Sequence, residues 1–88
     1  MVSKDFTITN KMGLHMRPAQ VLVSEMNKFA STVTIRFGEK KINAKGMMGL
    51  MSACIGCGAK ISMVCDGTDE QAALEAAAKL IQSGFDEE

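Results

Sequence analysis

The sequence predicts an α+β fold, a two-layer open-faced sandwich in which a four-stranded antiparallel sheet carries three helices on one face. Stretches that alternate between apolar and polar residues are interleaved with stretches of helical period, in the order βαββαβα. The alternation leaves one face of the sheet polar, so the helices must cover the other face. A length of 88 residues suits a single hydrophobic core, and we expect residues 1–88 to form one domain.

The first strand is expected over residues 2–9, where Val2, Phe6 and Ile8 share one face. After a loop over residues 10–13, a helix is expected over residues 16–28. Pro18 fits its first turn, because proline fixes φ and has no N–H group to leave unpaired there. The side chains expected to face the core recur at helical spacing: Ala19, Leu22, Val23, Met26 and Ala30.

The middle of the chain predicts a hairpin followed by a short helix. Residues 31–37 alternate clearly, and residues 38–39 form a tight turn into a short return strand over residues 40–44. The short helix is expected over residues 46–53 and is apolar on most of its surface. A last strand is expected over residues 60–66, with Ile61, Met63 and Cys65 on one face.

The final helix is expected to begin at a capping box and to end near Gly84. Thr68 would serve a backbone N–H in the first turn, and Gln71 would reach back to the cap. Its core-facing side chains are expected to be Ala73, Ala77, Leu80 and Ile81. We expect the acidic tail, residues 86–88, to be frayed.

Charge and hydropathy exclude several classes of protein. The ten basic and ten acidic residues cancel, and no basic run indicates a nucleic-acid partner. The first residues lack the apolar segment of a signal peptide, and no apolar run approaches the roughly 20 residues of a membrane span. We therefore expect a cytoplasmic protein with no direct membrane insertion.

Three cysteines are an odd number, which favours reduced thiols over a disulfide framework. Cys54 and Cys57 form a C-x-x-C pair, but no second ligand pair accompanies them. We interpret Cys54, Cys57 and Cys65 as small apolar side chains and expect neither a metal nor a cofactor. A thiol or metal protein built on these three residues remains an alternative.

The candidate functional residues are His15, the chain's one histidine, and Arg17. His15 precedes a predicted helix, where free backbone N–H groups and the helix dipole favour anions. A lone histidine is more often a surface residue or a helix cap, so position alone does not assign a function. An imidazole beside an arginine at such a site is suited to carrying a phosphoryl group.

The residues around His15 resemble a known signature. The stretch GLHMRPA at residues 13–19 is similar to the active-site motif of HPr, the histidine-containing phosphocarrier family of the bacterial phosphoenolpyruvate:sugar phosphotransferase system. The segments NAK at 43–45, MGLMS at 48–52 and GA at 58–59 resemble HPr segments at the same spacing, so the resemblance covers essentially the whole chain. It implies the HPr strand order 1-4-2-3.

The resemblance also implies a function. The chain would be a phosphocarrier rather than an enzyme, would accept a phosphoryl group from enzyme I on His15, and would pass it to the IIA domains of sugar permeases. The δ nitrogen of His15 would carry the group, and Arg17 would offset its charge. The backbone N–H groups of Met16 and Arg17 would bind the phosphate oxygens, while Pro18 fixes the helix start. A monomer is expected.

Met47, Met48 and Met51 of the short helix are expected to form the docking patch for both partners, because this helix lies beside the histidine in HPr. The alternative is that these side chains belong to the core. Met12, Met16 and Gln20 depart from common HPr residues, which bears on partner preference. Gly46 stands where many members have a regulatory serine. A purely regulatory HPr-like protein that carries no phosphate is a further alternative, although relatives of that kind lack the histidine.

Overall fold

The computed structural model describes residues 1–86, so the last two residues of the expected frayed tail lie outside it. The elements follow the predicted order βαββαβα and end in a short 3-10 turn, η1. They are β1 (Val2–Thr7), α1 (Met16–Met26), β2 (Thr32–Phe37), β3 (Lys40–Asn43), α2 (Met47–Ser52), β4 (Lys60–Asp66), α3 (Glu70–Gln82) and η1 (Gly84–Asp86). None of the helices within residues 1–86 has the length and apolar character that a membrane span requires.

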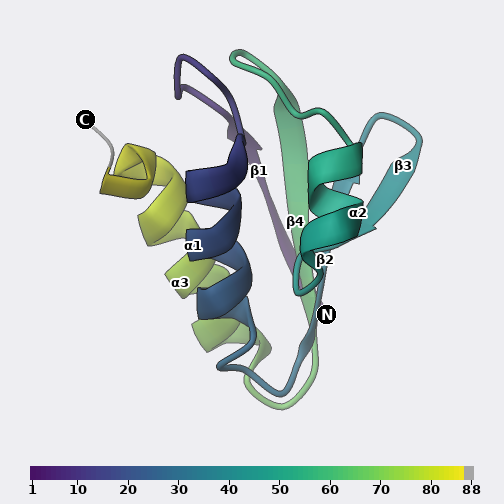
Figure 1. Cartoon of the computed structure of the whole chain (residues 1–88). Helices are drawn as coiled ribbons and strands as arrows, with labels where there is room; N and C mark the ends of the chain where they lie inside the picture. Colours follow the sequence, from purple (N-terminus) through teal and green to yellow (C-terminus); the bar gives the residue numbers. More distant parts are fainter. Residues whose placement is uncertain (87–88) are drawn as a thin grey trace.

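The four strands form one antiparallel sheet in the order β1-β4-β2-β3. The three α-helices pack on one face of this sheet, and the other face is bare (Figure 1). The predicted fold class is therefore confirmed, and so is the strand order that the resemblance implied. The register pairs Phe37 with Lys40, so residues 38–39 form the two-residue hairpin turn as predicted. Gly38 supplies the left-handed backbone there, with φ of 61°.

The core lies between the sheet and the helices. β4 supplies Ile61, Met63 and Cys65, each at most 2% exposed, as the alternation predicted. The largest fully buried helical side chains are Leu22, Met26 and Leu50. Burying each such side chain stabilises the fold by about 1.5–3 kcal/mol. In α3 the buried residues are Ala73, Leu74, Ala77 and Ile81, whereas the predicted Leu80 is half-buried.

The first helix ends earlier than predicted, at Met26 rather than at residue 28. Asn27 closes it, because its backbone N–H and its Nδ2 both donate to the carbonyl of Val23, at 3.0 and 2.8 Å. The chain then turns away from the helix axis. Ala30 is consequently exposed, not inward-facing, so this part of the prediction was wrong.

The predicted capping box at the last helix is also wrong. The N-cap of α3 is Asp69, not Thr68. The Asp69 carboxylate accepts hydrogen bonds from the backbone N–H groups of Ala30 and Ser31, at 2.8 and 2.9 Å, and from the Ser31 hydroxyl. These donors lower the pKa of Asp69 from 3.8 to about 2, the Ser31 hydroxyl most of all. Asp69 thus joins α3 to the segment between α1 and β2.

Candidate functional site

His15 is the N-cap residue of α1. Its backbone is extended, with φ of −76° and ψ of −171°, and its carbonyl accepts the first helical hydrogen bond from the N–H of Ala19, at 3.1 Å. The side chain is half-buried. This geometry places the imidazole at the positive end of a helix of eleven residues, where a negative charge is stabilised.

The first turn of α1 concentrates hydrogen-bond donors next to His15. Helix geometry leaves the N–H groups of Met16 and Arg17 without an acceptor inside the helix, since the first internal bond comes from Ala19. Pro18, the next residue, is buried and has no N–H. Both Met16 and Arg17 are exposed. The helix start therefore offers two backbone donors, and an exposed arginine lies two residues after His15.

The segment before His15 is held by the loop that follows α2. The N–H of Leu14 donates to the carbonyl of Ile55 at 2.8 Å, and both side chains are buried. Gly13 adopts a left-handed φ of 64°, and a Cβ there would lie 2.4 Å from the Ile55 oxygen and 2.5 Å from Cα of Gly56. Nothing in the local sequence pattern predicts this contact, because residues 13 and 55 are distant in the chain.

Asn10 fixes the other side of the same loop. Its carbonyl accepts a hydrogen bond from Gly13 N–H at 2.9 Å, and its Nδ2 donates to the carbonyl of Gly84 at 2.8 Å. The side chain is almost fully buried. Sequence reasoning missed Asn10, because its role depends on the turn after α3, which is distant in the chain. The loop that presents His15 is therefore anchored both to residue 55 and to residue 84.

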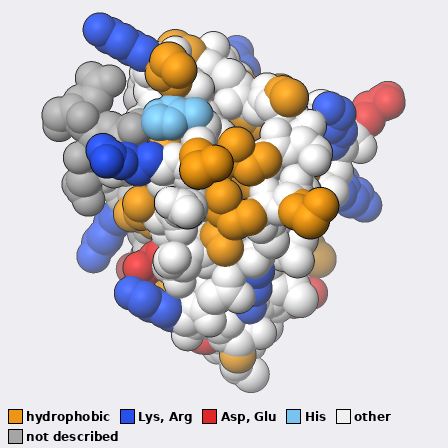
Figure 2. All heavy atoms as spheres, in the orientation of Figure 1, with side chains coloured by type: hydrophobic (Ala, Val, Ile, Leu, Met, Phe, Trp, Pro, Cys, Tyr) orange, Lys and Arg blue, Asp and Glu red, His pale blue; other side chains and the backbone are white. Residues whose placement is uncertain are grey.

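A methionine surface, defined as Met12, Met16, Met48 and Met51, surrounds the site. These side chains are 74%, 61%, 86% and 36% exposed, respectively. In Figure 2 the pale blue side chain is the histidine, and hydrophobic side chains gather beside it over the region that Figure 1 labels α2. Met47, which was predicted with this group, is half-buried and packs against the core.

The cysteines fall into two groups. Cys65 is fully buried, and burial raises the pKa of its thiol. Cys54 and Cys57 are exposed free thiols, so their interpretation as apolar filler is wrong. The Sγ atom of Cys54 lies 3.9 Å from the carbonyl oxygen of Met51 at the end of α2. Among residues 1–86 no cluster of three or more His, Cys, Asp or Glu side chains is arranged to hold a metal ion.

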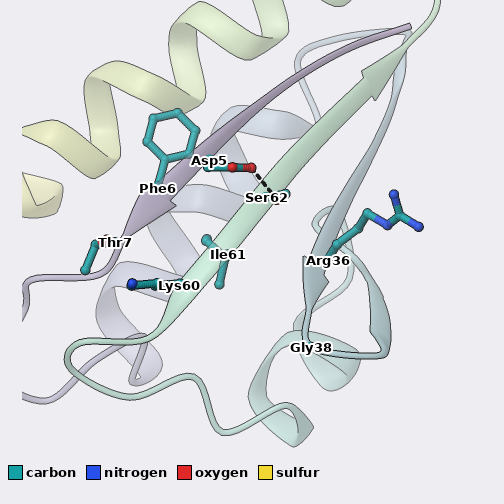
Figure 3. Close-up of a pocket in the computed structure, with 8 residues that line it drawn as sticks. All are labelled: Asp5, Phe6, Thr7, Arg36, Gly38, Lys60, Ile61 and Ser62. Atoms are coloured by element: carbon teal, nitrogen blue, oxygen red, sulfur yellow. Dashed lines mark hydrogen bonds between the residues drawn. The ribbon is translucent and has the colours of Figure 1, made fainter.

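A shallow hollow of about 460 Å³ lies on the sheet, away from His15. It is lined by Asp5, Phe6, Thr7, Arg36, Gly38, Lys60, Ile61 and Ser62 (Figure 3). Ser62 Oγ donates to the Asp5 carboxylate at 2.5 Å, and the Arg36 side chain points away from the hollow. None of the residues that line the hollow belongs to the site at the start of α1.

The structure is an open-faced α+β sandwich with a half-buried histidine at a helix N-terminus that favours anions. The chain belongs to the HPr family, because the family model described as "PTS HPr component phosphorylation site" matches residues 2–83. Membership supports a role as a phosphocarrier of the phosphotransferase system, that is, a carrier and not a catalyst.

Relatives agree over nearly the full length. The chain is 39% identical to phosphocarrier protein HPr of Treponema pallidum, over all of both chains. It is 45% identical to the HPr-like protein Crh of Halalkalibacterium halodurans, over 93% of this chain and 98% of that protein. The structure of HPr-C-His from Thermoanaerobacter tengcongensis superposes with a TM-score of 0.97 at 40% identity, over 100% of this chain and 99% of that one.

A solved relative of this chain is a dimer. A crystal structure of HPr from Thermoanaerobacter tengcongensis, 39% identical over 97% of this chain and 98% of that one, is described as a dimer and superposes with a TM-score of 0.78. The monomer expected from the resemblance is therefore not a general property of the family.

Proposed function

We propose that this protein accepts a phosphoryl group from enzyme I on His15 and passes it to the IIA domains of sugar permeases. The supporting observation is the position of His15 as the N-cap of α1, beside two backbone donors that have no acceptor in the helix. The proposal takes residues 1–88 as one domain that acts in the cytoplasm.

The proposed reaction is a reversible transfer of a phosphoryl group between a group on the partner protein and the imidazole of His15. The neutral imidazole attacks phosphorus through its δ nitrogen, the N–P bond forms, and the bond from phosphorus to the donor group breaks. Helix N–H groups of Met16 and Arg17 bind the phosphoryl oxygens, and the Arg17 guanidinium offsets their charge. The reverse steps, with a IIA domain as acceptor, regenerate the imidazole. Such a carrier needs an accessible side chain and a docking surface, not a substrate pocket.

Docking of both partners is assigned to Met48 and Met51 of α2, with Met47 at the margin. Met48 is 86% exposed, so a large apolar side chain is presented to solvent next to the site. Methionine is flexible and polarizable, which suits a surface that must fit two different proteins in turn. Exposed apolar patches of this kind commonly mark interaction sites.

Incubation with phosphoenolpyruvate and a bacterial enzyme I tests the proposal. We expect mass spectrometry to detect one acid-labile phosphoryl group on wild-type protein and none on His15→Ala. Circular dichroism of the variant serves as the folding control. Acid-stable label, or label that persists in the folded variant, would contradict the assignment of His15.

A second candidate function is regulatory binding without phosphate transfer. It is favoured by the 45% identity to the HPr-like protein Crh of Halalkalibacterium halodurans. The presence of His15 argues against it, because the resemblance to HPr implies that purely regulatory relatives lack this histidine. The same labelling experiment separates the two, since a purely regulatory protein stays unlabelled by enzyme I.

A further inference from the structure

The eight methionines of this chain differ widely in exposure. Met26 and Met63 are completely buried in the core. The methionine surface, by contrast, presents Met12, Met16 and Met48 with 61–86% of each side chain exposed, and Met51 with 36%. Because a thioether is oxidised according to its exposure, these two groups must differ strongly in reactivity.

Met1 is also exposed, at 78%, but lies directly before β1, whereas the four side chains of the methionine surface share one location. Met12 and Met16 flank the start of α1, and Met48 and Met51 lie on α2, which packs against α1. The hydrogen bond from Leu14 N–H to the Ile55 carbonyl holds the two segments together. A change in the polarity of these side chains therefore alters a single surface beside the imidazole.

We propose that Met12, Met16, Met48 and Met51 are a modification site for hydroperoxides, and that their oxidation to sulfoxides turns off docking to the carrier's partners. The inference rests on the proposed function, because it assigns a means of control to the same docking surface. The oxidant is hydrogen peroxide or an organic hydroperoxide.

The reaction is a two-electron oxygen transfer. The thioether sulfur attacks the terminal peroxide oxygen, an S–O bond forms, and the O–O bond breaks. Sulfur is oxidised to the sulfoxide, and the peroxide is reduced to water or to an alcohol. Methionine sulfoxide reductases return the sulfoxide to the thioether, so the modification is reversible.

Oxidation changes the surface without breaking the fold. A sulfoxide is polar and accepts hydrogen bonds, so burying it against an apolar partner leaves that acceptor without a donor. Met12, Met16 and Met48 contribute little to the core, because most of their surface is already in water, whereas Met51 is 36% exposed. The expected effect is therefore a weaker complex at an unchanged rate of chemistry in the complex.

Exposed thiols are the competing target. Cys54 and Cys57 are both exposed, and Cys54 lies at the end of α2. Dithiothreitol reverses disulfides and sulfenic acids but leaves methionine sulfoxide intact, so reduction after peroxide treatment separates the two chemistries. Leucine is close to methionine in volume and polarity and has no sulfur, so a Met→Leu variant keeps the surface apolar and resistant to peroxide.

The experiment compares wild type with the variant Met12→Leu/Met16→Leu/Met48→Leu/Met51→Leu. Each is treated with hydrogen peroxide, then with dithiothreitol, and mapped by mass spectrometry. Initial rates of phosphoryl transfer from enzyme I then give KM and kcat. We expect sulfoxides at Met1 and at the four positions of the methionine surface in wild type, but not at Met26 or Met63, with KM raised by about tenfold and kcat nearly unchanged. Treatment with methionine sulfoxide reductases should restore the KM of oxidised wild type. The quadruple leucine variant should have the same KM before and after peroxide treatment.

The inference alone is overturned by a fully oxidised wild type with an unchanged KM, or by a leucine variant that loses as much affinity as wild type. A fall in kcat without a change in KM also overturns it, because it would indicate damage to the imidazole. Untreated wild type that accepts no phosphate overturns the proposed function first, and the inference with it.

Discussion

The backbone N–H of Leu14 donates to the carbonyl of Ile55 at 2.8 Å, which joins the residue before His15 to the chain that leaves α2. The contact is close because Gly13 has no side chain and packs against Gly56. A tight backbone crossing therefore joins the loop that presents His15 to the loop that follows α2. Two glycines with nearly the same φ allow the importance of this crossing to be measured.

Gly13→Ala is expected to destabilise the protein strongly, and Gly38→Ala only mildly. Both glycines have a left-handed φ, 64° and 61°, which costs an alanine about 1–2 kcal/mol. A Cβ at Gly13 also meets backbone atoms at 2.4 and 2.5 Å, whereas at Gly38 nothing lies within 4 Å. We expect a loss of about 2–5 kcal/mol for Gly13→Ala, because overpacking adds to the strain. Urea unfolding measures both, and equal losses would contradict the role of the crossing.

Arg17→Ala is expected to slow phosphoryl transfer by roughly a hundredfold while leaving the fold intact. The guanidinium is exposed, so its removal should change the free energy of unfolding by no more than about 0.5 kcal/mol. Arg36→Ala is the matched control, because Arg36 is equally exposed but lies on the sheet. Rates of transfer from enzyme I decide the matter. Similar rates in both variants would make Arg17 a solvated cation without a role in transfer.

Met48→Asp is expected to weaken binding to enzyme I and to IIA domains together, by about 2 kcal/mol or more, because the carboxylate would be buried without a partner. Ala72→Asp serves as the control, since Ala72 is an exposed apolar residue on α3. NMR titration with each partner gives the affinities and the surfaces perturbed. Perturbations confined to the bare face of the sheet would rule out docking through α2.

Asp69 is expected to make stability depend on acid pH. Its pKa is lowered to about 2 from 3.8, so the folded state binds its proton less readily than the unfolded chain. The stabilisation is fully present above pH 4 and is lost as the pH falls toward 2. At pH 7 the free energy of unfolding of Asp69→Asn should be lower than that of wild type. Between pH 4 and pH 2 it should fall less than that of wild type.

Ser31→Ala should show an intermediate pH dependence, because it removes the hydroxyl donor and keeps both backbone donors to Asp69. Unfolding by urea across this pH range measures all three proteins. Parallel pH profiles for wild type and Asp69→Asn would show that another group controls acid stability.

Gly46→Ser is expected to create a phosphorylation site for an HPr kinase that wild type lacks. Gly46 is the N-cap of α2 with a φ of −119°, and a Cβ there would meet nothing closer than 3.8 Å. Serine should fit and stabilise the helix by a few tenths of a kcal/mol. Its phosphate would place a charge of about −1.5 to −2 beside Met47 and Met48. Stoichiometric acid-stable phosphoserine in wild type would show that regulation does not require residue 46.

Alternation and helical period were enough to predict the elements and their order. The hairpin at residues 38–39 and the buried face of β4 followed directly from local patterns, because each depends on residues adjacent in the chain. The strand order could not be derived in this way, since several orders satisfy the same alternation, and it came from the resemblance to HPr.

The errors arose where the local sequence pattern assigns one role to a residue and contacts elsewhere in the fold assign another. Thr68 and Gln71 have the right spacing for a capping box, but Asp69 takes the N-cap position and directs its carboxylate to Ser31 across the fold. Ala30 keeps the helical spacing, yet Asn27 ends the helix before it. In the site, the helix start at His15 was predictable from Pro18, whereas the anchoring by Ile55 was not.

The bare side of the sheet determines where the protein can be labelled or immobilised. Helices cover the face seen in Figures 1 and 2, on which His15 also lies, so the opposite face is accessible without entering the transfer site. Lys41 is exposed in β3 and pairs with Arg36 on that opposite face. A fluorophore or a surface tether could be attached at Lys41→Cys in a chain with Cys54 and Cys57 replaced by serine. The protein would then remain free to bind both the phosphoryl donor and the acceptor. Exchange of phosphate between donor and acceptor could then be followed on single, fixed molecules.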